Sequence, residues 1–125
     1  MNQCIVIRKE KIYKSLKTRP TPGKKLLKLY NRSDSVKRLP LNILEDNKII
    51  NDAEIHKQTG DLFFCLEGEA IFIYGGKLHG KKIAGGKETV LKPGDWLWIP
   101  PGQPHQHKCL GVTRLIIIKI PSRKS

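Results

Sequence analysis

A chain of 125 residues that is 38% hydrophobic has the size of one domain and can bury a core. Its longest purely aliphatic run, residues 115–118, is far too short to span a bilayer, and its charged start does not resemble a signal peptide. Three cysteines cannot all pair with one another, which argues against a disulfide framework and leads us to expect a cytoplasmic protein.

The formal charge of +13 is concentrated in the N-terminal third of the chain. Residues 1–40 carry twelve Lys and Arg against two acidic residues, whereas residues 41–125 carry twelve against nine. Such a segment either binds an anionic partner, such as nucleic acid, or is a solvated arm. It has no helix-turn-helix or zinc-finger pattern and only two tyrosines for stacking. We therefore expect a solvated arm, with nucleic acid not excluded as a partner.

Taken in chain order, the leader offers two candidate strands. Ile5 and Ile7 alternate as in an edge strand, and residues 24–30 form a second candidate between breaks made by proline and glycine. Residues 33–47 are ambiguous, because Pro40 argues against one continuous helix.

From residue 50 onward, short apolar runs alternate with turn residues, and no run has a helical period over three turns. The predicted strands are residues 61–66, 70–74, 88–91, 96–99 and 113–120. Short strands at this regular spacing predict an all-β sandwich or barrel. We therefore divide the chain into a basic extension, residues 1–49, whose strands add to the barrel or to a dimer interface, and a barrel, residues 50–125.

A glycine-rich loop inside this body imitates a phosphate-binding loop, because Gly75, Gly80 and Lys81 have the required spacing. However, Lys82 stands where a serine or threonine would meet magnesium, and no helix can follow directly. We predict a hairpin connection instead, with His79 as a solvated side chain on it.

Two histidines and two carboxylates have a spacing that suits a metal site. Glu54 and His56 are two residues apart, so on a strand they face the same side. Asp61 begins the next predicted strand, and His105 follows the rigid stretch PPGQP. Nitrogen and oxygen ligands that converge from adjacent strands inside a small barrel suit a divalent metal.

These residues resemble the two signature motifs of the cupin superfamily, over residues 50–120. In the first motif, Glu54 stands where the first histidine is expected, His56 where the second is and Asp61 where the glutamate is, and six residues then lead to Gly68. The second motif is nearly complete; it comprises Gly94, Pro100, Gly102 and His105, with Cys109 at the position of its asparagine.

The resemblance implies a small single-domain cupin with a double-stranded β-helix, a jelly-roll barrel of two antiparallel sheets that is often dimeric. The turn at residues 100–104 would then hold His105 at a fixed angle, with Trp96 and Trp98 anchoring the turn in the barrel wall. The implied metal ligands are Glu54, His56, Asp61 and His105, and the residues expected to line the pocket are Phe63, Cys65, Trp98, His107 and Cys109. Two imidazoles and two carboxylates suit Mn(II), Fe(II), Ni(II) or Zn(II), without choosing among them.

Each ligand also has an alternative. The histidines could be hydrogen-bonded pocket residues without a metal, and Glu54 could be an exposed strand residue. Asp61 is one methylene shorter than the expected glutamate and could pair with Lys57 instead.

Three functions stay open at this point. The first is a small metal-dependent enzyme, such as an isomerase or a dioxygenase, in which His107 or a non-ligating Glu54 moves a proton. The second is a metal-free cupin that binds or senses a ligand without catalysis. The third is a nucleic-acid-associated protein that acts through its basic arm. In the first two cases the partners are a small polar molecule and a second copy of the chain, and none of the three involves a membrane.

Overall fold

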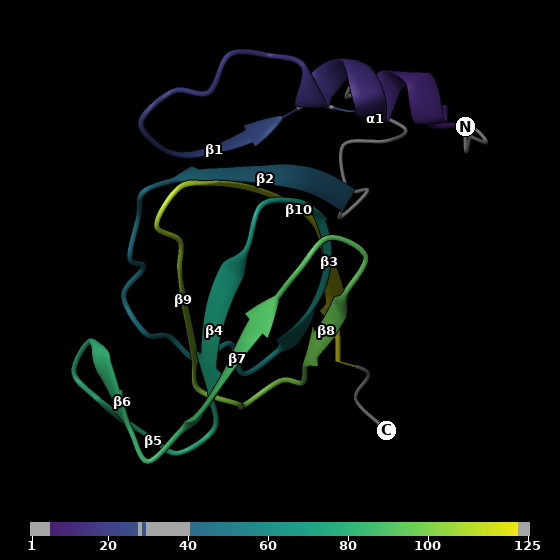
Figure 1. Cartoon of the computed structure of the whole chain (residues 1–125). Coiled ribbons are helices and arrows are strands. Elements are labelled where there is room, and N and C mark those ends of the chain that lie inside the picture. Colours follow the sequence, from purple (N-terminus) through teal and green to yellow (C-terminus); the bar gives the residue numbers. More distant parts are fainter. Residues whose placement is uncertain (1–5, 28, 30–40, 123–125) are drawn as a thin grey trace.

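The computed structural model describes residues 6–27, 29 and 41–122 (Figure 1). These residues contain one helix and ten strands: α1 (Lys9–Leu16), β1 (Gly23–Leu27), β2 (Leu41–Asn47), β3 (Thr59–Glu67), β4 (Ala70–Tyr74), β5 (Lys77–His79), β6 (Lys82–Ala84), β7 (Lys87–Leu91), β8 (Trp96–Ile99), β9 (His105–Lys108) and β10 (Val112–Pro121). Among the residues described, no helix is long and apolar enough to span a membrane.

The strands form two main antiparallel sheets and one small hairpin. A five-stranded sheet has the order β1-β2-β10-β3-β8, and a three-stranded sheet has the order β7-β4-β9. The chain before β3 continues the second sheet, because Ile50 forms a bridge with Lys108 and Glu54 forms one with His105. The expected all-β jelly roll of two antiparallel sheets is thereby confirmed.

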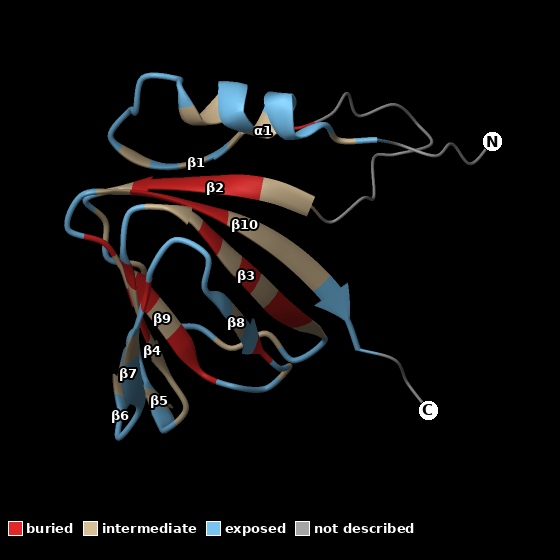
Figure 2. Cartoon of the chain, turned by 45° about the vertical axis from the view of Figure 1, so that its right-hand side comes forward, coloured by how far each residue is buried: buried red, intermediate tan, exposed pale blue. Residues whose placement is uncertain are grey.

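The hydrophobic core lies between the two sheets (Figure 2). Its buried members come from both of them: Phe63, Cys65, Ala70, Phe72, Leu91, Ile99 and Leu115. The rings of Phe63 and Phe72 meet across the sandwich with centroids 4.9 Å apart. Burying one such side chain contributes about 1.5–3 kcal/mol, so these contacts hold the two sheets together beside the metal-binding motifs.

All five strands predicted in the body are present, as β3, β4, β7, β8 and β10. The glycine-rich loop is the expected hairpin, since β5 pairs with β6 and His79 is exposed on it. Strand β2 occupies the C-terminal end of the ambiguous segment, and β1 covers the first part of the second candidate strand in the leader. The predicted barrel boundary at residue 50 therefore leaves β1 and β2 in the extension, where they add to the five-stranded sheet.

The leader also contains a helix that the sequence did not predict. Of the first candidate strand, Ile5 lies outside the described residues and Ile7 has no regular structure. Helix α1 buries no residue completely, but Ile12, Ser15 and Leu16 are half-buried at the i, i+3, i+4 spacing of one helical face. One face this narrow, in a strongly charged segment, is a weak sequence signal, which explains why the helix was missed.

Arg114 of β10 fixes the C-terminal end of α1 to the sheet. Its guanidinium donates to the carbonyl oxygens of Leu16, at 2.5 Å, and Thr18, at 2.7 Å. The same group contacts Glu45 and Glu67, each at 2.9 Å. Burial alone would lower the pKa of Arg114, but these two carboxylates raise it, so the charge of the clamp is maintained. The extension is therefore held by a buried ion cluster, above β2 in Figure 1.

The two tryptophans of β8 lie on the outer face of the five-stranded sheet, which differs from the expectation that they anchor the turn in the barrel wall. Trp96 is 58% exposed and stacks on Phe64, with centroids 4.4 Å apart, and Trp98 is 46% exposed. The ring of Trp98 covers Gly60, where an added Cβ would collide with it. Strand alternation explains the difference, because the inward positions of β8 are taken by Leu97 and Ile99.

Candidate metal centre

Backbone pairing brings the two sequence motifs together. Glu54 and His105 exchange two backbone hydrogen bonds, of 2.9 and 3.0 Å, and the amide of Gly102 donates to the carbonyl of His56 at 2.8 Å. Glu54 forms only an isolated bridge and His56 has no regular structure, so the strand expected through these two residues is absent. Residues directly opposite each other in an antiparallel pair share one face, which places the side chain of Glu54 beside that of His105.

The turn before β9 orients the ring of His105. Gly102 has a φ of +85°, a left-handed conformation that glycine adopts without steric cost, and the prolines on either side restrict the rest of the turn. Nδ1 of His105 lies 3.0 Å from the carbonyl oxygen of Gln103. Because a carbonyl can only accept, Nδ1 carries the proton and Nε2 presents its lone pair to the interior.

Four side chains converge on one point. The ligand atoms of Glu54, His56 and His105 all lie within 4.8 Å of one another. Oε1 of Glu54 is 3.2 Å from Nε2 of His56 and 3.7 Å from Nε2 of His105. Oδ2 of Asp61 is 3.6 and 3.5 Å from the same two nitrogen atoms. The structure therefore brings together all four residues that the family resemblance marks as ligands.

The two imidazole nitrogens at the centre have no hydrogen-bond partner. Nε2 of His56 and Nε2 of His105 are buried atoms, and no donor or acceptor among the described residues meets either of them with hydrogen-bond geometry. A lone pair that faces two carboxylate oxygens is unfavourable, and either a proton or a metal ion on the nitrogen relieves it. Two such nitrogens beside two carboxylate oxygens form a donor set that a borderline divalent metal satisfies. The residues present thus fit a metal ion.

Asp61 is the most constrained of the four. Its side chain is buried, and Oδ1 accepts a hydrogen bond of 2.7 Å from Nζ of Lys119, rather than from Lys57. Burial alone would raise the pKa of this carboxyl, but the His105 ring and the Lys119 ammonium lower it. Asp61 therefore stays ionised, with Oδ2 directed at the two histidines.

The pKa of His105 shifts in the opposite direction from that of Asp61, so both groups favour their charged forms. Burial alone would lower the pKa of His105, but Asp61, the Gln103 carbonyl and Glu54 raise it. In the absence of a metal, the carboxylates therefore favour a proton on the ring.

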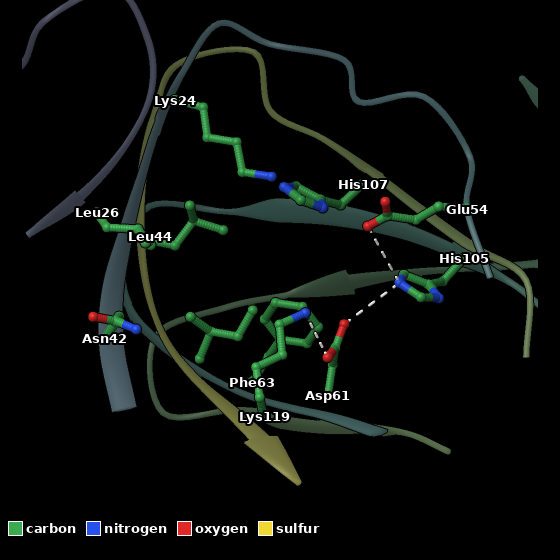
Figure 3. A pocket seen from close by; sticks show the side chains of 11 residues that line it. Lys24, Leu26, Asn42, Leu44, Glu54, Asp61, Phe63, His105, His107 and Lys119 are labelled. Atoms are coloured by element: carbon green, nitrogen blue, oxygen red, sulfur yellow. Dashed lines mark hydrogen bonds and ion pairs between the residues drawn. The ribbon is translucent and has the colours of Figure 1, made fainter. Parts of the chain in front are cut away.

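A pocket of about 200 Å³ adjoins the four residues (Figure 3). It is lined by Lys24, Leu26, Asn42, Leu44, Glu54, Asp61, Phe63, His105, His107, Ile117 and Lys119. Phe63 and His107 were expected there, whereas the residues from the extension, β2 and β10 were not. Residues 24 and 26, and likewise 42 and 44, are two apart, so on a strand each pair faces the same side. This spacing was the sequence signal that could have placed them in the pocket wall.

Three other residues expected in the pocket lie elsewhere. Trp98 faces outward, and Cys65 is fully buried in the core, where its thiol donates to the carbonyl of Gly68 at 3.3 Å. Burial raises the pKa of Cys65 to about 11, so this thiol is an inert core residue. Cys109 is buried as well and does not line the pocket. Both described cysteines are free thiols, and the cytoplasmic location inferred from unpaired cysteines stays a prediction.

His107 is fixed by a network of its own. Nε2 lies 2.7 Å from Oδ2 of the buried Asp46, and the amide nitrogen of Asn51 lies 3.0 Å from Nδ1 and 2.9 Å from Nε2. The ring also packs near Phe72, with centroids 5.3 Å apart. His107 therefore forms a polar wall of the pocket, separate from the four converging residues.

Comparison with known proteins agrees with this geometry. A family model described as a cupin domain matches residues 44–120, which is more than half of the chain. The chain belongs to the cupin family. No curated protein is similar enough in sequence to this cupin to serve as a relative.

Solved structures share the fold at low sequence identity. The protein TT1209 from Thermus thermophilus aligns with a TM-score of 0.62 at 16% identity, over 88% of this cupin and 93% of that chain. The cobalt(II) form of HppE in complex with Tris buffer aligns with a TM-score of 0.55 at 22% identity, over 81% and 55%. The CENP-C cupin domain of Drosophila melanogaster gives 0.55 at 15% identity, and this cupin spans 61% of that chain while 66% of its own length is covered. These likenesses show the fold alone.

Proposed function

We propose that this cupin binds a divalent metal through Glu54, His56 and His105, with Asp61 as a fourth ligand, and uses it to act on a small polar molecule in the adjoining pocket. The observation that carries the proposal is the pair of buried Nε2 atoms that have no hydrogen-bond partner among the described residues and face the same two carboxylates. Manganese, iron, nickel and zinc all suit this donor set, and an isomerase or a dioxygenase reaction suits the pocket.

The chain's own residues prepare the site in three ways. The Gln103 carbonyl holds the His105 ring in the tautomer that leaves Nε2 free to ligate. Lys119 keeps Asp61 ionised, so that two carboxylates balance the charge of a divalent ion. Such an ion, when bound, polarises an oxygen atom of the bound molecule as a Lewis acid. His107 stays outside the ligand set, and its Nε2 is hydrogen-bonded to Oδ2 of Asp46 at the pocket wall.

The structural neighbours support metal binding by this fold. One neighbour is an iron(II) form of HppE and another is the cobalt(II) form of the same protein, at 20% and 22% identity. Because those identities are low, the donor set of this cupin carries the argument, and the neighbours add only that the fold accommodates such ions.

Elemental analysis of protein purified without an affinity tag tests the proposal. After metal-supplemented growth, we expect close to one metal ion per chain in the wild type, and a sharp loss in His56→Ala and in His105→Ala, since each removes one inner ligand. His79→Ala is the matched control, because His79 is exposed on the β5–β6 hairpin. Equal, near-zero metal in all four proteins would contradict a metal site.

One observation favours a metal-free pocket as the second candidate. Lys119 already neutralises Asp61 at 2.7 Å, so a binding or sensing cupin without catalysis has a stable charge arrangement here. In that case the four proteins hold no metal, but the pocket still takes a small ligand.

We also propose that this cupin is a homodimer that associates through the outer face of its five-stranded sheet. Among the described residues of that face, Trp96, Trp98 and Ile120 are exposed. Exposed aromatic residues gathered on one sheet are typical of an interface. Light scattering on the wild type and on variants of this face tests the assembly.

A further inference from the structure

We propose that the N-terminal extension determines the charge of the molecule that this cupin binds: Lys24 pairs with an anionic group, so the ligand is a small organic acid. The inference rests on the proposed function, because the other end of such a ligand would meet the metal-binding residues.

Strand β1 forms one wall of the pocket. It pairs with β2 so that Lys24 lies opposite Asp46 and Leu26 lies opposite Leu44. Cross-strand partners share a face, and Lys24, Leu26 and Leu44 all line the pocket. In Figure 3, Lys24 extends from β1 toward the interior of the pocket, with Glu54 and His105 across from it.

Lys24 is the lysine of this pocket whose ammonium is not already paired with a carboxylate of the described residues. Its ammonium makes no hydrogen bond or ion pair with any described residue. The other lysine of the pocket, Lys119, is engaged by Asp61 at 2.7 Å. Lys25, on the opposite face of β1, pairs with Glu45 at 3.3 Å. Lys24 is exposed at the edge of the pocket, so its ammonium can be reached by an anion that enters from solvent and attracts it toward the pocket.

The backbone that carries Lys24 is held at both of its sides. The turn before β1 is tied to the sheet, since Thr21 donates its amide to Glu45 at 3.3 Å and accepts from the Asn47 side chain at 3.2 Å. Arg114 fixes the preceding end of α1. Strand β1 then pairs along its whole length with β2. Because the backbone is fixed in this way, only the side chain of Lys24 has to be ordered when an anion binds.

The arrangement defines the chemical class of the ligand. Asp61 is shared between Lys119 and the metal-binding point, so with a divalent ion bound the lining has no excess negative charge, and Lys24 is left to pair with an anionic group at the other side of the pocket. The space between is apolar, formed by Leu26, Leu44, Phe63 and Ile117. A volume of about 200 Å³ holds a short hydroxy or keto dicarboxylic acid. Residue 24 lies outside the matched cupin domain of residues 44–120, so this recognition belongs to the extension of this chain.

Calorimetric titration of the full chain tests the inference with malate and malamate, two probes that differ by one carboxylate replaced with an amide. We expect the wild type to bind malate about tenfold more tightly, as one charge-assisted contact provides. The preference should fall to near unity in Lys24→Gln. Lys77→Gln, which removes an exposed charge on β5 away from the pocket, should keep the wild-type preference.

Metal content of the same samples separates this inference from the proposed function. Lys24 is not a ligand, so Lys24→Gln should hold as much metal as the wild type. If the wild type binds no metal, the proposed function fails, and a malate preference that is lost in Lys24→Gln still supports the anion site. Three outcomes would overturn the proposed pairing of Lys24 with an anionic group. They are a malate preference unchanged by Lys24→Gln, equal affinity of the wild type for both probes, and no detectable malate binding by the wild type at millimolar concentration.

Discussion

At the scale of single residues, hydrogen bonds decide what each member of the site can do. His105 and His107 lie two residues apart on β9, and both are buried. The first has one nitrogen engaged by a backbone carbonyl and the other directed at two carboxylates, which suits a ligand. The second is hydrogen-bonded to the buried Asp46 and contacts the amide of Asn51, which suits a fixed wall. Spacing alone does not distinguish the two.

The pKa of His105 predicts opposite pH dependences for the metal-free and the metal-loaded protein. Its pKa is raised in the fold, so a protonated ring stabilises the metal-free protein below the unfolded value of about 6.5, and this stabilisation is lost as pH rises through the higher folded value. A metal requires the neutral ring, so metal stabilisation grows over the same range. Between about pH 6 and 8, the melting temperature measured with a chelator should fall as pH rises. The melting temperature measured with the metal should increase over the same range.

Proton NMR of the metal-free protein checks the premise directly. The His105 ring should titrate above about pH 6.5, the ordinary value for imidazole. A His105 ring that titrates below about pH 6.5, or the same pH dependence of the melting temperature with and without metal, would contradict the role given to the carboxylates.

At the scale of elements, a strand or helix could be predicted from the sequence where its inward-facing residues are apolar. Strands β4 and β10 place apolar residues in the core, and the sequence predicts both strands. Strand β2 places Glu45 and Asp46 in fully buried positions, and buried charges resemble exposed ones in a sequence. Their partners, Arg114 and His107, are more than sixty residues away. Local periodicity cannot show such pairs, because only the tertiary fold brings them together.

The Arg114 clamp is expected to be a major contributor to stability. Arg114→Met leaves the fully buried Glu45 without its main counter-charge, which should lower the free energy of unfolding by about 3–5 kcal/mol. Burial alone would raise the Glu45 pKa, but Arg114 and the Thr21 amide lower it, so this stabilisation is present near neutral pH and lost in acid. Urea denaturation measures the loss.

The control is Lys108→Met, which removes a half-exposed ion pair with Glu88 at 3.9 Å and should change stability by less than about 1 kcal/mol. Replacing Glu45 by Gln together with Arg114→Met should restore part of the loss, because the buried charge is gone. A loss below about 1 kcal/mol for Arg114→Met alone, or no recovery in the double variant, would contradict the clamp.

At the scale of the whole molecule, the basic residues of the extension lie in two kinds of place, at the pocket and on the exposed surface. The extension contributes one lysine to the pocket, while most basic side chains of α1 and its flanks are exposed. Nucleic acid stays a prediction for that arm. The motif spacing was enough to indicate which four side chains meet, but Lys24 and Lys119 were not foreseen, since their place in the pocket depends on the order of strands in the sheet.

The outer face of the large sheet predicts how this cupin assembles. Trp96 and Trp98 are 58% and 46% exposed on this one face, and exposed aromatic residues are enriched at interfaces, so light scattering at micromolar protein should return twice the 14.2 kDa mass of the chain. Trp96→Lys should yield the monomer, because it places a charge in the proposed interface. Val90→Lys is matched to it, being 42% exposed on the other sheet, and should stay dimeric. A wild type of 14.2 kDa, or dimers that survive Trp96→Lys, would mean that this face is left to solvent.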